Sequence, residues 1–209
     1  MKRPIRHKPI FLRRSLLAGA AFLATPSIVR AQGTNGVALV VGNSKYQWEA
    51  QLGNVKRDAP DIAKALQAKG LKTELLQDLN RNTFQQAVSK FKAEASGANL
   101  AVFYYAGHGA SWDKYTYLVP VDADLSTPNK VDKLLPVGDI VAALNGATNR
   151  LLMFDSCRNN PADGWRQTEA EYFAVQNVDK VPLPENSLIL YSTSSGRIEI
   201  GRASCRERV

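Results

Sequence analysis

The feature that most constrains the fold is an alternation between short apolar segments of strand length and longer amphipathic ones. Residues 37–41 are apolar at every position, as expected for a strand buried on both faces of a sheet. Further segments of strand length follow at 71–76, 100–105, 151–154 and 187–191. The chain is therefore predicted to contain five strands, and most of the segments between them are long enough to form helices.

The segments between these strands carry apolar side chains at helical spacing. The first predicted helix begins near Asp58, which places Pro60 in its first turn. Asn82 or Thr83 is expected to cap the second helix, and the third lies around residues 137–144. Strands that alternate with helices predict an α/β fold in which a mainly parallel sheet is sandwiched between helices.

The net charge of +8 suggests a nucleic-acid binder only until it is mapped along the chain. Residues 1–31 carry basic side chains and no acidic ones, whereas residues 32–198 carry equal numbers of both. The body is therefore neutral, and nucleic acid is not an expected partner. The two Cys and two His are too scattered to match a zinc-ligand spacing, and one possible disulfide does not make a disulfide scaffold.

The first 31 residues are typical of an export signal. A basic segment is followed by an uncharged apolar run over residues 15–25, which is too short to span a bilayer as a helix. Arg13-Arg14 resembles a bacterial twin-arginine signal, although a general secretory signal is basic here too. We expect cleavage after Ala31, no remaining membrane anchor, and a periplasmic or secreted protein.

Residues 199–209 differ in character from the rest of the chain. They show neither strand alternation nor a helical stripe, and from Ile200 they resemble the translation of a DNA-sequencing adapter. A natural arginine-rich tail is the alternative. We expect an artefactual tail that takes no part in the fold, Cys205 included, and a natural domain cut short after Ile198.

Two predicted strands end in residues that can do chemistry. The third strand is followed by His108, and the fourth leads through Asp155 to Cys157. Because ligands bind at the carboxyl ends of parallel strands, both side chains are expected at one edge of the sheet. A lone Cys is usually an inert core residue and a lone His a structural one, but their joint placement favours a catalytic pair.

A thiolate is a nucleophile, and a neighbouring imidazole can take its proton and later protonate the leaving amine. The glycines on either side of His108 let the backbone approach a substrate, and the N–H groups of Gly109 and Cys157 are candidate oxyanion donors. No third member of a catalytic triad is evident from the sequence.

This pattern resembles the caspase and metacaspase clan of cysteine peptidases. Cys157 follows His108 by 49 residues, close to the spacing of the caspase signature. The segments 104–109, 118–123 and 191–193 are similar to bacterial members. The resemblance covers about residues 37–198, and the catalytic domain is expected over residues 34–198. It implies a caspase-like three-layer α/β/α fold lacking its last strand and helices. It also implies a cysteine endopeptidase with Cys157 as nucleophile and His108 as general base.

The resemblance departs from caspases just before the cysteine. Caspases have Gln two residues before it, whereas this chain has Asp155, as metacaspases do. A carboxylate there attracts a cation, so the implied substrate is a polypeptide with Arg or Lys at P1. Asp58 sits where similar metacaspases place a second pocket acid. Asp155 as a structural hydrogen-bond acceptor and Asp58 as a helix-terminal acid are the alternatives.

No cofactor is expected, and no metal ligands are assigned. Some metacaspases need calcium, but Asp122 and Asp124 alone do not make a clear site. A nucleotide-binding domain is excluded by the lack of a phosphate-binding glycine loop. The remaining alternative to an enzyme is an exported, non-catalytic caspase-like module that recognises a binding partner. The sequence does not indicate an oligomeric state.

Overall fold

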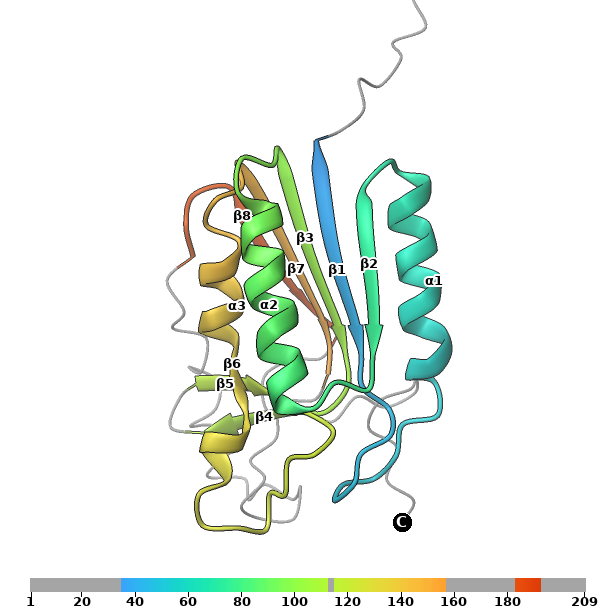
Figure 1. The fold of residues 1–209 in the computed structure, drawn as a ribbon, viewed down its shortest axis with the longest axis vertical. Helices are drawn as coiled ribbons and strands as arrows, with labels where there is room; N and C mark the ends of the chain where they lie inside the picture. Colours follow the sequence, from blue (N-terminus) through green and yellow to red (C-terminus); the bar gives the residue numbers. More distant parts are fainter. Residues whose placement is uncertain (1–34, 113–114, 157–182, 193–209) are drawn as a thin grey trace, which may run out of the picture. The chain divides into compact units, whose positions relative to one another are not determined.

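The structure, a computed structural model, describes residues 35–112, 115–156 and 183–192. Within them, five parallel strands form one sheet in the order β2-β1-β3-β7-β8 (Figure 1). The strands are β1 (Gly36–Gly42), β2 (Lys72–Gln77), β3 (Leu100–Ala106), β7 (Asn149–Asp155) and β8 (Ser187–Tyr191). The predicted α/β fold class with a parallel sheet is confirmed.

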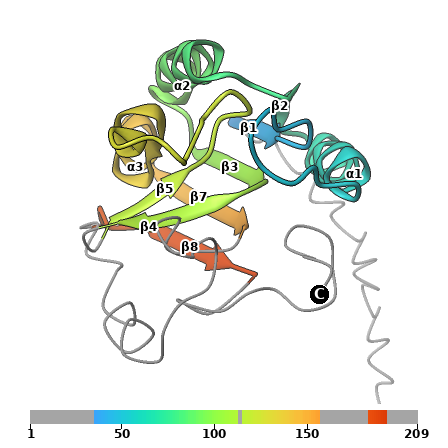
Figure 2. The ribbon, with the colours of Figure 1, turned by 90° about the horizontal axis from the view of Figure 1, so that it is seen from below.

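Helices lie on both faces of this sheet, as Figure 2 shows in a view along the strands. They are α1 (Val55–Ala68), α2 (Arg81–Ala95) and α3 (Val137–Ala143). Alternate side chains of each strand point to opposite faces, so Val40 packs with α1 while Val41 packs with α2 and α3. Among the described segments, no helix combines the length and apolar character that crossing a bilayer needs.

A second, smaller sheet follows directly after β3. Its antiparallel strands are β4 (Gly109–Trp112), β5 (Tyr115–Leu118) and β6 (Leu135–Pro136), in that order, and a 3-10 helix, η1 (Lys130–Lys133), precedes β6. Figure 1 places this sheet beyond the carboxyl ends of the large sheet's strands. It therefore stands at the edge where the sequence predicts the active site.

Two helix starts differ from the prediction. Helix α1 begins at Val55 rather than near Asp58, so Pro60 lies inside the helix. Val55 and Ala59 pack so closely on Gly42 that a Cβ there would lie 2.7 Å from the Ala59 Cβ. This packing stabilises the earlier first turn although proline cannot donate a hydrogen bond.

Helix α2 is capped by Asn80 rather than by Asn82 or Thr83. The Asn80 side chain accepts a hydrogen bond of 2.9 Å from the backbone N–H of Thr83. Several residues with capping side chains stand close together here, and the choice among them depends on where the preceding strand ends.

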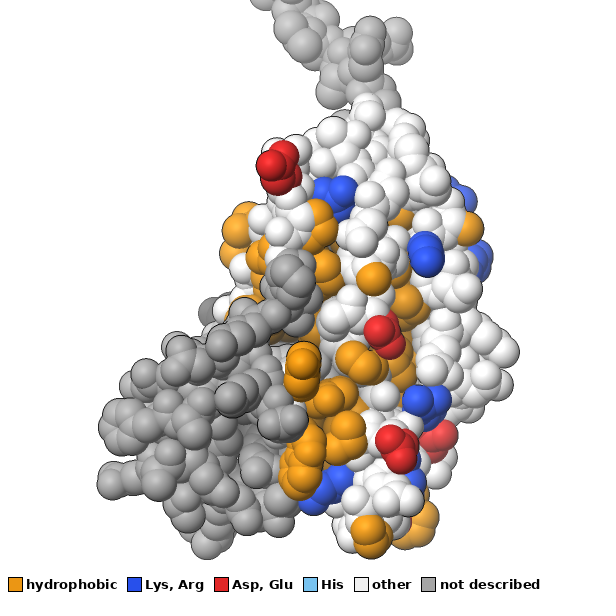
Figure 3. All heavy atoms as spheres, turned by 90° about the vertical axis from the view of Figure 1, so that its left-hand side faces the viewer, with side chains coloured by type: hydrophobic (Ala, Val, Ile, Leu, Met, Phe, Trp, Pro, Cys, Tyr) orange, Lys and Arg blue, Asp and Glu red, His pale blue; other side chains and the backbone are white. Residues whose placement is uncertain are grey.

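The last strand of the large sheet is covered less than the others. Leu188 and Leu190 of β8 are 54% and 47% exposed, whereas Ile189 and Tyr191 on the opposite face pack against the core. Figure 3 looks at the molecule from the side of α3 and β8, where hydrophobic side chains form a band. The uncovered face of β8 is the face on which α1 lies at the other end of the sheet.

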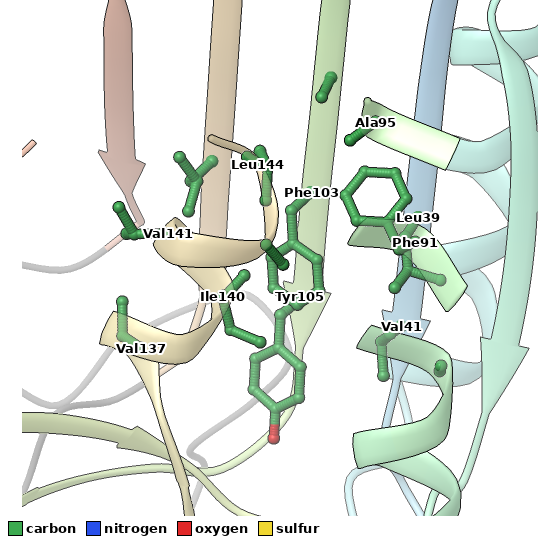
Figure 4. Close-up of a cluster of buried hydrophobic side chains, with 14 of the residues drawn as sticks. Leu39, Val41, Phe91, Ala95, Phe103, Tyr105, Val137, Ile140, Val141 and Leu144 are labelled. Carbon is green, nitrogen blue, oxygen red and sulfur yellow. The ribbon is translucent and has the colours of Figure 1, made fainter. Parts of the chain in front are cut away.

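The largest buried cluster lies between the sheet and helices α2 and α3 (Figure 4). Phe103 and Ile140 are fully buried in it, and the Tyr105 ring lies between them and the carboxyl end of β3. The hydroxyl of Tyr105 points away from the apolar side chains in this view. That hydroxyl contacts the backbone of His108, so the buried cluster and the candidate site are connected through Tyr105.

Candidate active site

The two strands that carry the predicted site are hydrogen-bonded neighbours. Ala106 at the end of β3 pairs with Asp155 at the end of β7, and the Gly107 N–H donates to the Asp155 carbonyl at 3.3 Å. Gly107 therefore follows β3 at the same level at which Ser156 follows β7, and His108 is the next residue along the chain. Cys157 itself lies outside the described residues, and buried Ser156 is the last described residue before it.

His108 is held in a buried position with a defined ring orientation. The side chain is 5% exposed, and its Nε2 lies 2.8 Å from the carbonyl oxygen of Ala50. A carbonyl only accepts hydrogen bonds, so Nε2 carries the proton of the neutral ring and Nδ1 keeps its lone pair. The hydrogen bond thus fixes which nitrogen is the base.

Burial lowers the pKa of His108 to about 4, and the hydrogen bond to Ala50 opposes this only in part. Removing an imidazolium from water is costly, so the neutral ring is favoured. Near pH 7 the ring is therefore neutral and able to accept a proton.

Sequence patterns did not identify Ala50 or Tyr46, the two residues that orient the imidazole. Ala50 acts through its backbone carbonyl, which every residue possesses. Tyr46 lies in the same loop, and its ring centroid is 4.5 Å from that of His108 at an interplanar angle of 53°. Its position two residues after Ser44 carries no recognisable signal without the tertiary structure.

The loop that carries Tyr46 and Ala50 is tied to its neighbours by two polar side chains. Asn43 donates to the carbonyl of Val119 at 3.1 Å and accepts from the N–H of Leu79 at 2.9 Å. Asp78 accepts from the N–H groups of Ser44 and Lys45 at 2.8 and 2.9 Å. These bonds join the segments that follow β1, β2 and β5.

The same bonds explain the ionisation of Asp78. Partial burial by itself raises the pKa of this carboxyl, but the hydrogen bonds from Ser44 and Lys45 outweigh it and the pKa is lowered. The carboxylate is therefore charged under ordinary conditions, which keeps it an acceptor for both N–H groups.

Gly109 begins β4, paired with Leu118. The neighbouring N–H of Val119 donates to the His108 carbonyl at 3.0 Å, which makes Gly109 and Leu118 the pair without mutual hydrogen bonds. The Gly109 N–H consequently points away from β5. This orientation suits the oxyanion donor predicted from the sequence.

The two predicted pocket acids lie on different elements at this edge. Asp155 is half-buried; its Oδ2 accepts from the Tyr104 hydroxyl at 3.4 Å, and its Oδ1 is buried without a hydrogen-bond partner among the described residues. Asp58 lies in the first turn of α1, beside Ala59, which packs against the end of β1. The helix is preceded by Asn54, so Asp58 is a first-turn residue and not the N-cap.

The other acids considered are occupied by hydrogen bonds from the protein. Asp122 accepts from the N–H of Arg81 at 2.9 Å, and Asp124 accepts from the hydroxyl of Ser126 at 2.6 Å. Within the described segments, no group of three or more His, Cys, Asp or Glu side chains could hold a metal ion.

Comparison with known proteins shows which family this chain matches. The family model of the caspase domain matches residues 35–198. Mucosa-associated lymphoid tissue lymphoma translocation protein 1 of Homo sapiens is 29% identical over 124 residues, and its Mus musculus homolog gives the same identity and length. Each match covers 58% of this chain and 15% of the relative. The chain thus resembles a small part of these longer proteins.

Proposed function

The chain belongs to the caspase domain family, and from this premise we propose that it is a cysteine endopeptidase with a Cys157–His108 pair. The observation that carries the proposal is the bond between His108 Nε2 and the Ala50 carbonyl, 2.8 Å long. It leaves Nδ1 as the proton acceptor of a buried, neutral ring. The register of β3 and β7 supports the pairing, since Ala106 pairs with Asp155 and these residues precede His108 and Cys157 by the same number of positions.

The proposed reaction starts with transfer of the Cys157 proton to His108 Nδ1. The thiolate sulfur then forms a bond to the scissile carbonyl carbon, and the carbonyl electron pair moves to its oxygen. When the C–N bond breaks, the amine leaves with the proton from Nδ1. Water, giving a proton to the same nitrogen, hydrolyses the thioester and regenerates the thiol.

Two groups of the protein support the charges that form. The N–H of Gly109 points away from β5 and is the proposed donor to the oxyanion, with the N–H of Cys157 as the second donor. The Ala50 carbonyl stabilises the imidazolium through Nε2, in place of the side-chain third member that many triads have.

For substrate recognition we propose Arg or Lys at P1, bound by Asp155 with Asp58 as a second acid. The buried Oδ1 of Asp155 supports this role, because it retains a hydrogen-bonding capacity that the described residues do not use. A guanidinium or ammonium would satisfy it with a charge-assisted bond. An aspartate at P1 would instead bring two carboxylates together.

The decisive experiment uses the natural protein continued beyond Ile198 and compares it with its Cys157→Ala variant on peptides that differ only at P1. Wild type is expected to cut the Arg and Lys peptides, and the variant to leave them intact with its fold unchanged by circular dichroism. Equal turnover by the Cys157→Ala variant would overturn the hypothesis that the protein is a cysteine endopeptidase. Binding of the peptide without cleavage by either protein would favour the recognition module.

We also propose that the protein is exported through its first 31 residues, which lie outside the described part of the chain. The basic segment and the apolar run that follows it support this. Replacing Arg13 and Arg14 by Lys should retain the product in the cytoplasm if the twin-arginine route is used. Continued export would indicate the general secretory route.

A further inference from the structure

We propose that the hydroxyls of Tyr46 and Tyr105 close a ring of hydrogen bonds on the backbone of His108, and that these two tyrosines act as positioning residues for the base. The inference deepens the function proposed for His108 and rests on it. It assigns a task to two buried hydroxyls that the proposed chemistry does not itself use.

Three hydrogen bonds form the ring. The backbone N–H of His108 donates to the Tyr46 oxygen at 2.8 Å, and the two hydroxyl oxygens lie 3.2 Å apart. The Tyr105 hydroxyl lies 2.8 Å from the carbonyl of His108 and 3.1 Å from that of Val119. The chain of bonds thus begins and ends on the same residue.

The chemistry of the partners fixes the direction of every bond. Carbonyl oxygens only accept, so the single Tyr105 proton is directed to the carbonyls. Tyr46 must then donate its own proton to the Tyr105 oxygen, while its lone pair accepts from the N–H of His108. Bonds aligned head to tail in this way strengthen one another in a buried environment.

Burial keeps both hydroxyls protonated, as the ring requires. Burial is the main cause that raises the pKa of Tyr46, and it also raises the pKa of Tyr105. Both phenols are in direct contact with His108: the Tyr46 ring faces the imidazole, and the Tyr105 hydroxyl donates to the backbone carbonyl. Neither phenol changes charge over the working pH range.

The two tyrosines reach His108 from different elements, which makes the ring a link between them. Tyr105 is fixed in β3, where Phe84 of α2 stacks on it with ring centroids 5.9 Å apart. Tyr46 belongs to the loop after β1, which also supplies the Ala50 carbonyl. The ring therefore couples the backbone of His108 to the loop that orients its side chain.

Gly107 leaves the space in which the two hydroxyls meet. A Cβ at this position would lie 2.5 Å from the Tyr105 oxygen and 2.6 Å from the Tyr46 oxygen. The backbone of Gly107 is not in the left-handed region, so its conformation alone does not demand glycine. A side chain here would displace the hydroxyls, which makes Gly107 the third component of the arrangement.

The test starts with Tyr46→Phe in the full chain, which keeps the aromatic ring and removes the hydroxyl. We expect kcat to fall by about 10- to 100-fold with KM nearly unchanged, since small displacements of a catalytic group are costly. A loosened imidazole is better hydrated, so its pKa should move from about 4 toward its ordinary value. NMR titration of the His108 ring measures this directly, and the acid limb of the rate profile should move with it.

Gly107→Ala supplies a second, independent disturbance of the same ring. We expect it to lower kcat to a similar extent, and the double variant Tyr46→Phe/Gly107→Ala to lose little more than the worse single variant. Residues that act through one arrangement are not additive. Losses that multiply would mean that the two positions act separately, which would overturn the proposal.

Phe91→Leu is the matched control, because Phe91 is buried in the α2 cluster and makes a purely apolar contribution. It should lower stability while leaving kcat and the His108 titration unchanged. A Tyr46→Phe protein with wild-type kcat and an unchanged His108 pKa would overturn the proposal. If wild type itself cuts no peptide, the proposed function fails, and the NMR titration still decides whether the hydroxyls position His108.

Discussion

His108 and Asp155 stand at the ends of neighbouring strands, yet the protein holds them in very different ways. His108 has its N–H, its carbonyl, its Nε2 and its ring face in contact with Tyr46, Tyr105 and Ala50. Within the described residues, the Asp155 carboxylate accepts a single side-chain hydrogen bond, from the Tyr104 hydroxyl at 3.4 Å. The base is pre-organised by the described fold, whereas the proposed pocket acid retains capacity to bind a partner.

The same contrast runs through the whole sheet. At the β1–β3 side both faces are covered, since Val40 and Val41, which point to opposite faces, are both 0% exposed. At β8 the corresponding face leaves Leu190 47% exposed. The β1–β3 side is therefore expected to contribute most of the stability that the described residues provide. The stability of β8 is expected to change most when another group binds on its exposed face.

The largest expected effect tests the pre-organised base. His108→Ala should lower kcat/KM by about 10⁴-fold or more, because nucleophile and base act as a unit. Combining it with Cys157→Ala should cause no further loss. Steady-state kinetics on an Arg peptide checks this, and a loss of less than 10-fold would remove His108 from the mechanism.

Core truncation compares the stability of the two sides of the sheet. Phe103→Ala in the fully buried cluster should lower the free energy of unfolding by about 3–5 kcal/mol. Leu190→Ala, at an exposed site, should lower it by less than about 1 kcal/mol. Urea titration gives both values, and comparable losses would show that β8 is covered more completely than the contrast above implies.

The pH dependence of stability sharpens the contrast by isolating His108. Its pKa in the folded protein is about 4, below the ordinary 6.5, so the unfolded chain binds the proton first as the pH falls. The contribution of the neutral His108 ring to the free energy of unfolding is thus fully present above about pH 6.5. It falls by about 3 kcal/mol as the pH is lowered to about 4. Carboxyls whose pKa is lowered, such as Asp78, lose their contribution only at still lower pH.

Urea unfolding at several pH values measures this decline, and His108→Asn is its control. The variant should show little change in unfolding free energy between pH 6.5 and 5. A decline equal to that of wild type would assign the effect to other groups.

The smallest expected effect concerns Asp155, whose carboxylate has fewer contacts than His108. Asp155→Asn should lower kcat/KM on an Arg peptide by about 100-fold, which corresponds to about 2.7 kcal/mol for a charged pair in a partly buried site. Hydrolysis of a matched peptide with a neutral P1 residue should change much less. Equal losses on both peptides would make Asp155 a structural acceptor, as the alternative interpretation holds.

Much of the framework follows from local patterns in the sequence. The apolar run at 37–41 needs burial on both faces, and in the structure it is the second strand of the sheet order, between β2 and β3. The strand–helix alternation also predicted that His108 would follow a strand at the carboxyl edge. The start of α1 was wrong by three residues, since the contact of Val55 and Ala59 with Gly42 is not a local property.

The sequence by itself determined the strands, the helices and the strand-end position of His108, because hydrophobic periodicity is read from neighbours along the chain. Only the tertiary structure decided which groups orient His108. A carbonyl such as that of Ala50 is present in every residue, and its selection depends on how the loop after β1 is tied to the rest of the fold. That loop is fixed by bonds such as Gln47 N–H to the Val121 carbonyl, 2.9 Å long, between residues far apart in the chain. Contacts of this kind leave no pattern in the sequence, because they arise from packing and not from local periodicity.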